Sequence, residues 1–284
     1  MSLNIYKRKA ATTPLPENLT FDTEISQEDN LNATSKLWIQ NNGTVFKQYI
    51  IYNESTEKNI DNLLQIVSYK KLKRISELSM PLAIYENNGK VEGYLMKYHS
   101  MNPLSYYFDK REHSVVFMVF QHLAALINKL PKDVFIGDLH AGNILASKEK
   151  IRVIDIDGFS LKHGHKISCP LKWYSEHSIF YHKKYRDSKG NFAIPRDSDI
   201  ACFLWLILNY LMKVNPFSYT ENELRNYMEF LKERGLPRDL YEMIICMMSP
   251  TCNYLIPKAF ETVPTQILSD CSYKDFIISS MKYV

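Results

Sequence analysis

The spacing of apolar residues changes near residue 100, and this change restricts the chain to a mixed fold with a β-rich first part. Five short apolar runs in the first hundred residues have the length and composition of strands: 21–26, 36–40, 44–51, 82–86 and 91–98. Asn41-Asn42-Gly43 and Asn87-Asn88-Gly89 predict tight turns, because Asn and Gly tolerate positive φ. Helical spacing over 56–78 separates the third run from the fourth. We therefore predict a five-stranded sheet with one helix.

Beyond residue 103 the apolar residues follow a helical period. Four segments show it: 114–130, 197–214, 221–234 and 237–248. The second is apolar nearly all round, which predicts a buried helix. Short β-like pieces at 134–136, 144–146 and 151–156 flank polar loops. The predicted fold class is α+β, with a loose leader at 1–19, a β-rich part at 20–98 and a helical part at 99–284.

Charge and cysteine usage exclude several classes of partner. The 35 basic and 31 acidic side chains give a net charge of only +4, evenly spread, so we expect neither nucleic acid nor membrane as a partner. The longest apolar run, 200–212, is shorter than the roughly 20 residues of a membrane helix, and 1–13 lacks the apolar core of a secretory signal. Five cysteines without a C-x-x-C pair fit a reduced, cytoplasmic chain. Nothing in the sequence indicates an oligomeric state.

Acidic and amide side chains gather in two short polar segments of the second half. Asp138 and Asn143 lie in the segment Gly137-Asp138-Leu139-His140-Ala141-Gly142-Asn143, and Asp155 and Asp157 follow after the apolar piece at 151–154. Carboxylate and amide oxygens are hard ligands suited to Mg²⁺, and a further carboxylate can orient a hydroxyl group. Asp138 and Asn143 are also common turn residues. Taken together, the two segments indicate a site for magnesium and phosphate.

Four motifs, in the correct order, make the chain resemble the protein-kinase-like superfamily. They are Thr44-Val45-Phe46-Lys47 (like V-A-I-K), Asp138-Leu139-His140-Ala141-Gly142-Asn143 (like D-L-x-x-x-N), Asp155-Ile156-Asp157-Gly158-Phe159 (at the place of D-F-G) and Ser198-Asp199 (like the start of the buried central helix). The D-L-H-x-G-N form is typical of divergent bacterial-type kinase-like proteins, including relatives of aminoglycoside and choline kinases. The resemblance implies a two-lobed fold, with a small β-rich N-lobe and a helical C-lobe.

The resemblance also implies roles for individual residues. Asp138 would orient the substrate hydroxyl and accept its proton, while Asn143 and Asp155 would hold magnesium. Asp157 stands at the glycine position of D-F-G and is either a further metal ligand or a surface acid. Asp199 would bind backbone amides of the catalytic loop, unless it only caps its helix.

Lys47 would neutralise phosphate charge, although a lysine on a strand can also be merely solvated. It would need an acidic partner from the first helix, for which we choose Asp61, with Glu57 and Glu77 as alternatives. The fifth strand would end in the hinge that binds adenine, formed by Met96, Lys97 and Tyr98. The loop at 27–35, which would cover the phosphates, contains no glycine.

The implied function is transfer of the γ-phosphoryl group of ATP, with Mg²⁺, to a hydroxyl. A divergent Ser/Thr protein kinase acting on a protein substrate is the first reading, because only about forty residues separate the hinge from Asp138, which leaves no room for the inserted substrate sites of small-molecule kinases. A small-molecule kinase of the aminoglycoside or choline type is the second. A pseudokinase that serves as a binding or scaffold module is the third.

Overall fold

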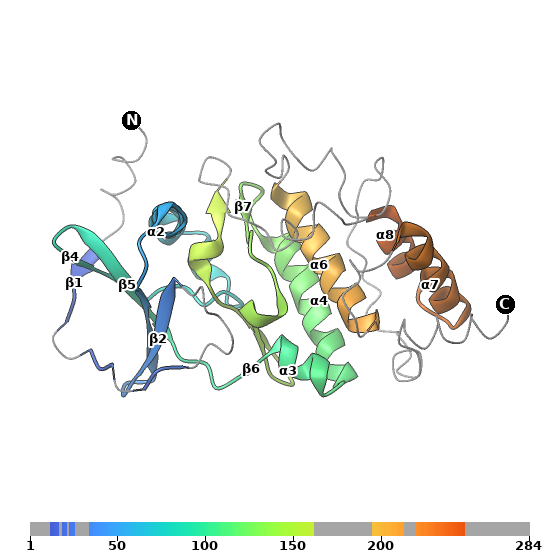
Figure 1. Ribbon diagram of the computed structural model, residues 1–284, viewed down its shortest axis with the longest axis horizontal. Coiled ribbons are helices and arrows are strands. Elements are labelled where there is room, and N and C mark those ends of the chain that lie inside the picture. Colours follow the sequence, from blue (N-terminus) through green and yellow to red (C-terminus); the bar gives the residue numbers. More distant parts are fainter. Residues whose placement is uncertain are drawn as a thin grey trace. The chain divides into compact units, whose positions relative to one another are not determined.

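The computed structural model describes residues 12–16, 19–21, 23–25, 34–161, 195–212 and 220–247 of the 284 residues. It is a mixed α+β structure with a five-stranded sheet and several helices (Figure 1). The chain forms two compact units. The first comprises Met1–Met101, Asp133–Ile136 and Arg152–Ile167, and the second comprises Asn102–Lys132, Gly137–Ile151 and Ser168–Val284. The single boundary predicted at residue 98 therefore differs from this division, because two later segments belong to the first unit.

Two hairpins form most of the sheet in the first unit, whose strand order is β1-β4-β5-β3-β2. The first hairpin joins β2 (Ser35–Gln40) to β3 (Thr44–Tyr49), and the second joins β4 (Ala83–Asn87) to β5 (Lys90–Lys97). The turn residues have positive φ, 74° at Gly43, 51° at Asn88 and 76° at Gly89. Both predicted turns are confirmed.

The fifth strand of the sheet is not the one that the sequence predicted. Strand β1 (Thr12–Pro14) lies within the predicted leader and pairs in parallel with β4. The segment predicted as the first strand contributes an isolated bridge from Glu24 to Trp38. Pro14 cannot donate a backbone hydrogen bond, and β1 is at the edge of the sheet, where a proline is tolerated.

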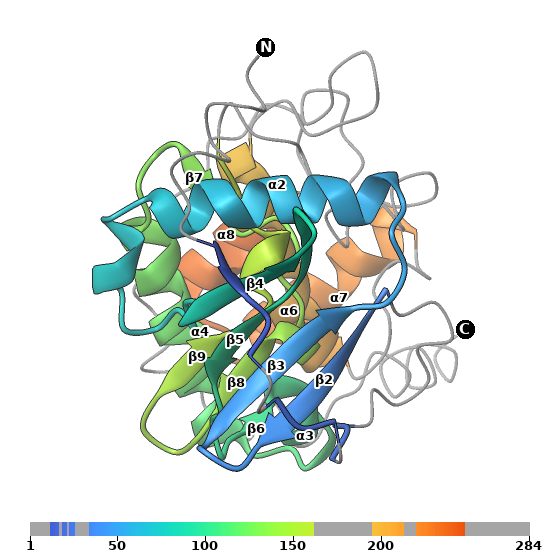
Figure 2. The same cartoon turned by 90° about the vertical axis from the view of Figure 1, so that its left-hand side faces the viewer.

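Helix α2 (Glu54–Ser68) crosses the strands of this sheet (Figure 2). Its N-cap is Asn53, whose Oδ1 accepts a hydrogen bond from the backbone N–H of Thr56 at 2.9 Å. Its apolar face joins strand residues in one buried core: Val45, Tyr49, Ile60, Leu63, Leu64, Ile84, Val91, Tyr94 and Met96. The helix ends ten residues before the predicted end, and a short 3-10 helix, η1 (Leu72–Arg74), follows it.

The two later segments complete the first unit beside α2. Strand β7 (Val134–Phe135) pairs antiparallel with β10 (Ser160–Leu161). The 3-10 helix η3 (Ile156–Gly158) lies between β9 (Ile151–Val153) and β10 and packs against α2. The fold thus places the Asp155–Asp157 segment in the same unit as β3.

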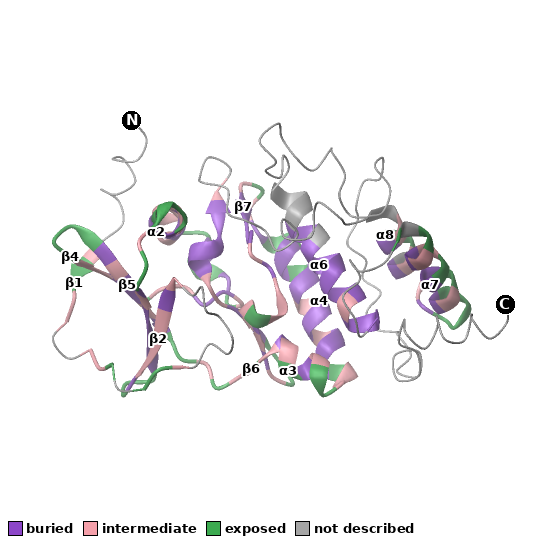
Figure 3. Cartoon of the chain, in the orientation of Figure 1, coloured by how far each residue is buried: buried purple, intermediate pink, exposed green. Residues whose placement is uncertain are grey.

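The second unit is helical, as predicted. Among the described residues, its helices are α3 (Leu104–Asp109), α4 (His113–Lys129), α6 (Pro195–Met212), α7 (Glu221–Glu233) and α8 (Arg238–Met247). The described part also contains β6 (Asn102–Pro103), β8 (Ile144–Ala146) and the 3-10 helix η2 (Ala141–Asn143). Helices α4 and α6 pack together, and Figure 3 shows both buried along much of their length. Across the part of the chain that the structure describes, no helix combines the length and apolar character needed to span a membrane.

Candidate functional site

Lys47 is buried in the first unit, where it contacts two carboxylates. It lies on β3 between Val45 and Tyr49, and side chains alternate along a strand, so all three share the face that is covered by α2. Its Nζ lies 2.9 and 3.0 Å from the two carboxylate oxygens of Asp157 and also donates to Asp155. Folding thus joins side chains that are more than a hundred residues apart in the sequence.

Asp157 is a buried carboxylate, and both of its oxygens accept hydrogen bonds from side chains. Its side chain is 1% exposed. In addition to Lys47, the hydroxyl of Tyr49 donates to Oδ2 and the hydroxyl of Tyr94 donates to Oδ1, each at 2.9 Å. Burial of a charged group is costly unless it is paired and hydrogen-bonded, and here both conditions are met. Asp157 is therefore not a surface acid, which corrects one of the two predicted readings.

Asp155 differs from Asp157 in both backbone and exposure. Its side chain is 32% exposed, and its backbone is left-handed, with φ 63° and ψ 48°. A residue other than glycine in this region costs of order 1 kcal/mol, and such strain is concentrated at functional sites. The turn at Asp155 is what allows the chain to leave β9 and to enter η3.

The pKa values of Lys47 and Asp157 are shifted in the directions that keep both groups charged. Burial lowers the pKa of Lys47, but the carboxylates of Asp155 and Asp157 outweigh it and raise that pKa above its ordinary value. Burial raises the pKa of Asp157, but the Lys47 ammonium and then the two tyrosine hydroxyls lower it below its ordinary value. Burial, followed by the charge of Asp157, raises the pKa values of Tyr49 and Tyr94 well above the usual range. The tyrosines are therefore neutral donors.

The predicted catalytic loop lies in the second unit and is ordered by its own side chains. The Asn143 amide Nδ2 donates to the Asp138 carbonyl at 3.1 Å and to its carboxylate Oδ2 at 3.4 Å. His140 Nδ1 accepts from the Gly142 backbone N–H at 3.1 Å and caps η2. The Asp138 side chain remains 33% exposed. The loop therefore presents a carboxylate whose orientation is supported by Asn143.

Asp199 supports the start of this loop from helix α6. The backbone N–H of Gly137 donates to Asp199 Oδ1 at 3.0 Å, and Gly137 has a φ of 76°. The predicted structural role of Asp199, binding a backbone amide of the loop, is confirmed. Because α6 begins at Pro195, Asp199 lies inside the helix, and the alternative reading as an N-cap is wrong.

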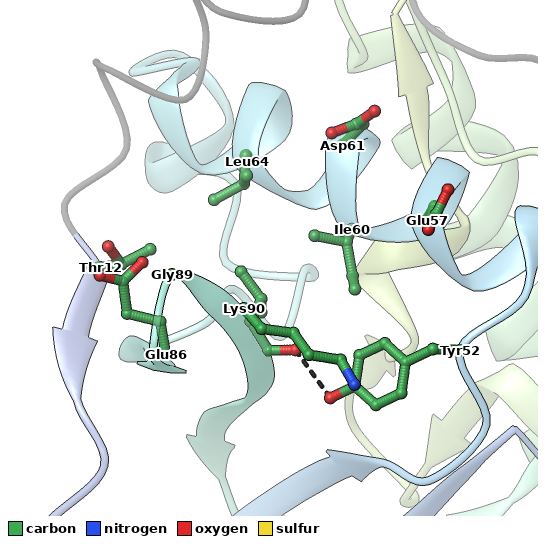
Figure 4. A pocket seen from close by; sticks show the side chains of 10 residues that line it. Thr12, Tyr52, Glu57, Ile60, Asp61, Leu64, Glu86, Gly89 and Lys90 are labelled. Atoms are coloured by element: carbon green, nitrogen blue, oxygen red, sulfur yellow. Dashed lines mark hydrogen bonds between the residues drawn. The ribbon is translucent and has the colours of Figure 1, made fainter.

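The structure gives Lys47 a different acidic partner from the one predicted. Asp61 and Glu57, both on α2, line a hollow of about 420 Å³ next to the β4–β5 hairpin (Figure 4). In that hollow the Lys90 ammonium lies 3.2 Å from the centre of the Tyr52 ring. The third candidate, Glu77, accepts a hydrogen bond from Ser76. The acids that bind Lys47 come instead from the segment after β9.

The predicted hinge residues end strand β5 and interact with β3. Met96 is buried and pairs with Val45, and Lys97 pairs with Thr44. The backbone N–H of Tyr98 donates to the Gly43 carbonyl at 3.0 Å. This donor is therefore already used within the first unit. Most of the glycine-free loop at 27–35 lies outside the described residues.

The donor chemistry of both units is compatible with magnesium. Asp155 supplies a partly exposed carboxylate, and Asn143 retains an amide oxygen as an acceptor because its amide nitrogen binds Asp138. No group of three His, Cys, Asp or Glu side chains that could hold a metal occurs among the described residues. Mg²⁺ bound together with a nucleotide needs only one or two protein carboxylates, since phosphate and water fill the other positions.

Tyr49 and Tyr94 were not predicted as members of the site. Tyr49 is two residues from Lys47, so the two-residue period of a strand places both side chains on one face. That signal was present in the sequence. Tyr94 is directly opposite Lys47 in the β3–β5 pairing, and this register is not readable from the sequence.

A buried ammonium beside one fixed and one partly exposed carboxylate can bind phosphate together with a divalent cation. A separate loop with a partly exposed, oriented carboxylate can position a hydroxyl group and take its proton. No protein-family model and no curated protein matches the chain.

Proposed function

We propose that the chain is an ATP- and Mg²⁺-dependent phosphotransferase with a two-lobed protein-kinase-like fold, which transfers the γ-phosphoryl group to a Ser or Thr hydroxyl of a protein. The observation that carries the proposal is the contact between Lys47 and Asp155. The resemblance assigns these two residues to one nucleotide site, although 108 residues separate them in the sequence. Their contact in one unit supports that assignment.

The roles of the chain's own residues follow from their charges. Lys47 offsets the negative charge of the phosphates. Asp138 accepts the proton of the attacking hydroxyl, whose oxygen forms the new bond to phosphorus while the bond to the leaving ADP oxygen breaks. Asn143 keeps the Asp138 carboxylate in place through the hydrogen bonds of its amide.

Asp155 and Asn143 are the residues that would hold Mg²⁺. The ion would neutralise charge on the phosphate oxygens. Asp155 belongs to the first unit, and Asn143 and Asp138 belong to the second.

An assay of phosphoryl transfer from γ-labelled ATP with Mg²⁺ tests this function. The wild-type chain should label itself or a general protein substrate. Asp138→Ala should abolish labelling and leave nucleotide binding intact, because this side chain acts on the hydroxyl and not on ATP. Unchanged turnover in Asp138→Ala would refute the catalytic assignment. Labelling of sugar or amine alcohols without any labelled protein would favour the small-molecule kinase.

A second candidate function, a pseudokinase that acts as a binding module, is favoured by one observation. Asp157 stands at the glycine position of D-F-G and binds Lys47 with both carboxylate oxygens. In a binding module, this pair would serve as a permanent structural element. Thermal stabilisation of the wild type by ATP with Mg²⁺, lost in Asp155→Ala, would speak against this candidate. The absence of any nucleotide effect would favour it over the enzyme.

A further inference from the structure

We propose that Asp157 is the positioning residue that holds Lys47 ready for phosphate, in place of a carboxylate from helix α2. In this arrangement Asp155 is the exchangeable partner of Lys47 and Asp157 is the fixed one. The phosphate-binding part of the inference rests on the proposed function. The anchoring of Lys47 can be tested without it.

The geometry around Asp157 is that of a fixed anchor. Both of its oxygens accept from Lys47, and each also accepts from one tyrosine hydroxyl. Tyr49 and Lys47 lie on β3, and Tyr94 is opposite Lys47 on β5. One face of two adjacent strands therefore supplies every one of these donors. A carboxylate held by several donors from a rigid sheet has little freedom to leave.

Helix α2 does not present an acid to this cluster. Its buried positions are Thr56, Ile60, Asn62, Leu63, Leu64 and Ile66, none of which is acidic. Asn62 faces the segment after η3, because its amide donates to the Ser160 hydroxyl at 3.2 Å. The two α2 acids that were candidates, Glu57 and Asp61, line the separate hollow beside Lys90. The helix packs against η3, and η3 carries the acid.

The two carboxylates that contact Lys47 differ in how easily they can change partner. The Asp155 side chain is 32% exposed and that of Asp157 is 1% exposed. A partly exposed carboxylate can exchange a protein contact for a contact with water or a cation. A buried carboxylate that leaves its ammonium partner loses the ionic attraction that offsets the cost of its desolvation. Asp157 therefore keeps Lys47 in position when Asp155 turns to a cation. Displacement of α2 alone would not remove the counter-ion of Lys47.

The first experiment measures anchoring by thermal unfolding without nucleotide. Lys47→Met should lower Tm, because it leaves Asp157 buried without a cation. The double variant Lys47→Met/Asp157→Asn should recover part of this loss. The matched double variant Lys47→Met/Asp155→Asn should not, because water can solvate Asp155. Equal recovery of Tm in the two double variants, or no recovery in Lys47→Met/Asp157→Asn, would overturn the role of Asp157 as an anchor. This holds even if the chain is a phosphotransferase.

The second experiment separates positioning from chemistry in the kinetics of ATP. Asp157→Asn should raise KM for ATP by about tenfold and change kcat less than KM, because Lys47 loses its fixed position and not its charge. Asp155→Asn should lower kcat by at least about a hundredfold. Asp61→Asn, which represents the rival helix partner, should leave both constants as in the wild type, as should the remote control Glu86→Gln.

A rise of KM in Asp61→Asn with none in Asp157→Asn would overturn the inference, even if Lys47→Met proves too unstable for the first experiment. If the wild type neither binds nor turns over ATP, the proposed function fails. In that case, recovery of Tm in the Lys47→Met background by Asp157→Asn, but not by Asp155→Asn, would still establish that Asp157 anchors Lys47.

Discussion

At the scale of single residues, the two tyrosine hydroxyls bound to Asp157 contribute to the stability of the first unit. Removing the hydroxyl in Tyr94→Phe leaves Asp157 Oδ1 with Lys47 as its remaining donor. Loss of one hydrogen bond to a buried charged group costs about 1.5–3 kcal/mol. We expect a decrease of this size in the free energy of unfolding, measured by urea titration.

The matched control is Tyr85→Phe on β4. The Tyr85 ring packs against Phe46 in the same sheet, and this contact does not require the hydroxyl. The change should stay within about 0.5 kcal/mol of the wild type, as expected for a substitution away from a buried polar network. Equal losses of unfolding free energy in the two variants would show that the hydrogen bond from Tyr94 to Asp157 does not stabilise the chain.

The sequence predicted some members of the site and not their pairing. Lys47 and Asp155 were predicted because short motifs identify them. Asp157 could not be assigned as the partner of Lys47, since this requires the left-handed turn at Asp155 that directs η3 toward β3. Asp61 was chosen from its place on a predicted helix, but it lines the hollow near Lys90, and the acids that bind Lys47 follow β9 instead.

At the scale of elements, the approach of β5 to β3 depends on Gly93. A Cβ at this position would lie 2.1 Å from the Lys47 carbonyl oxygen and 2.9 Å from the Phe46 ring. Gly93→Ala should therefore push the two strands apart and destabilise the chain by about 2–3 kcal/mol. It should also shift Lys47, so the loss of stability should be accompanied by weaker nucleotide binding. Urea titration and ATP titration measure the two effects.

Gly89→Ala in the β4–β5 turn is the control for this substitution. A Cβ at Gly89 meets nothing within 4 Å, and only its φ of 76° opposes the change. The expected cost is about 1 kcal/mol from backbone strain alone, without an effect on ATP binding. A smaller cost at Gly93 than at Gly89 would contradict the close strand approach.

The start of helix α2 provides a second prediction at this scale. Asn53→Ala removes the oxygen that accepts from the backbone N–H of Thr56 and should cost about 1 kcal/mol in the free energy of unfolding. Lys58→Ala removes a solvent-exposed ion pair with Glu54 one turn further and should cost less than about 0.5 kcal/mol. Urea titration distinguishes the two. A larger loss of unfolding free energy in Lys58→Ala than in Asn53→Ala would show that the cap does not stabilise α2.

Most elements were predictable because their signals are local. The Asn–Gly turns fix both hairpins, and apolar periods located α4 and α6 to within two residues. The end of α2 was not predictable, since Leu72 and Leu78 continue the helical spacing after Ser68 without a Gly or Pro stop signal. Strand β1 was missed because its pairing with β4 is long-range and its three residues carry no strand pattern.

At the scale of the whole molecule, residues of both units have roles in the proposed phosphoryl transfer. The first unit contributes Lys47 and Asp155, and the second contributes Asp138 and Asn143. Each set has its own support, from β3 and η3 in the first unit and from α6 in the second. We expect substitution of either proposed metal ligand, Asp155 or Asn143, to weaken the binding of ATP with Mg²⁺.

Titration of ATP into the wild type, Asp155→Ala and Asn143→Ala, with and without Mg²⁺, measures this directly. We predict that Mg²⁺ strengthens ATP binding to the wild type, and that each substitution reduces this magnesium-dependent affinity by at least about tenfold. Magnesium-dependent binding that survives in either variant would contradict the assignment of that residue to the metal.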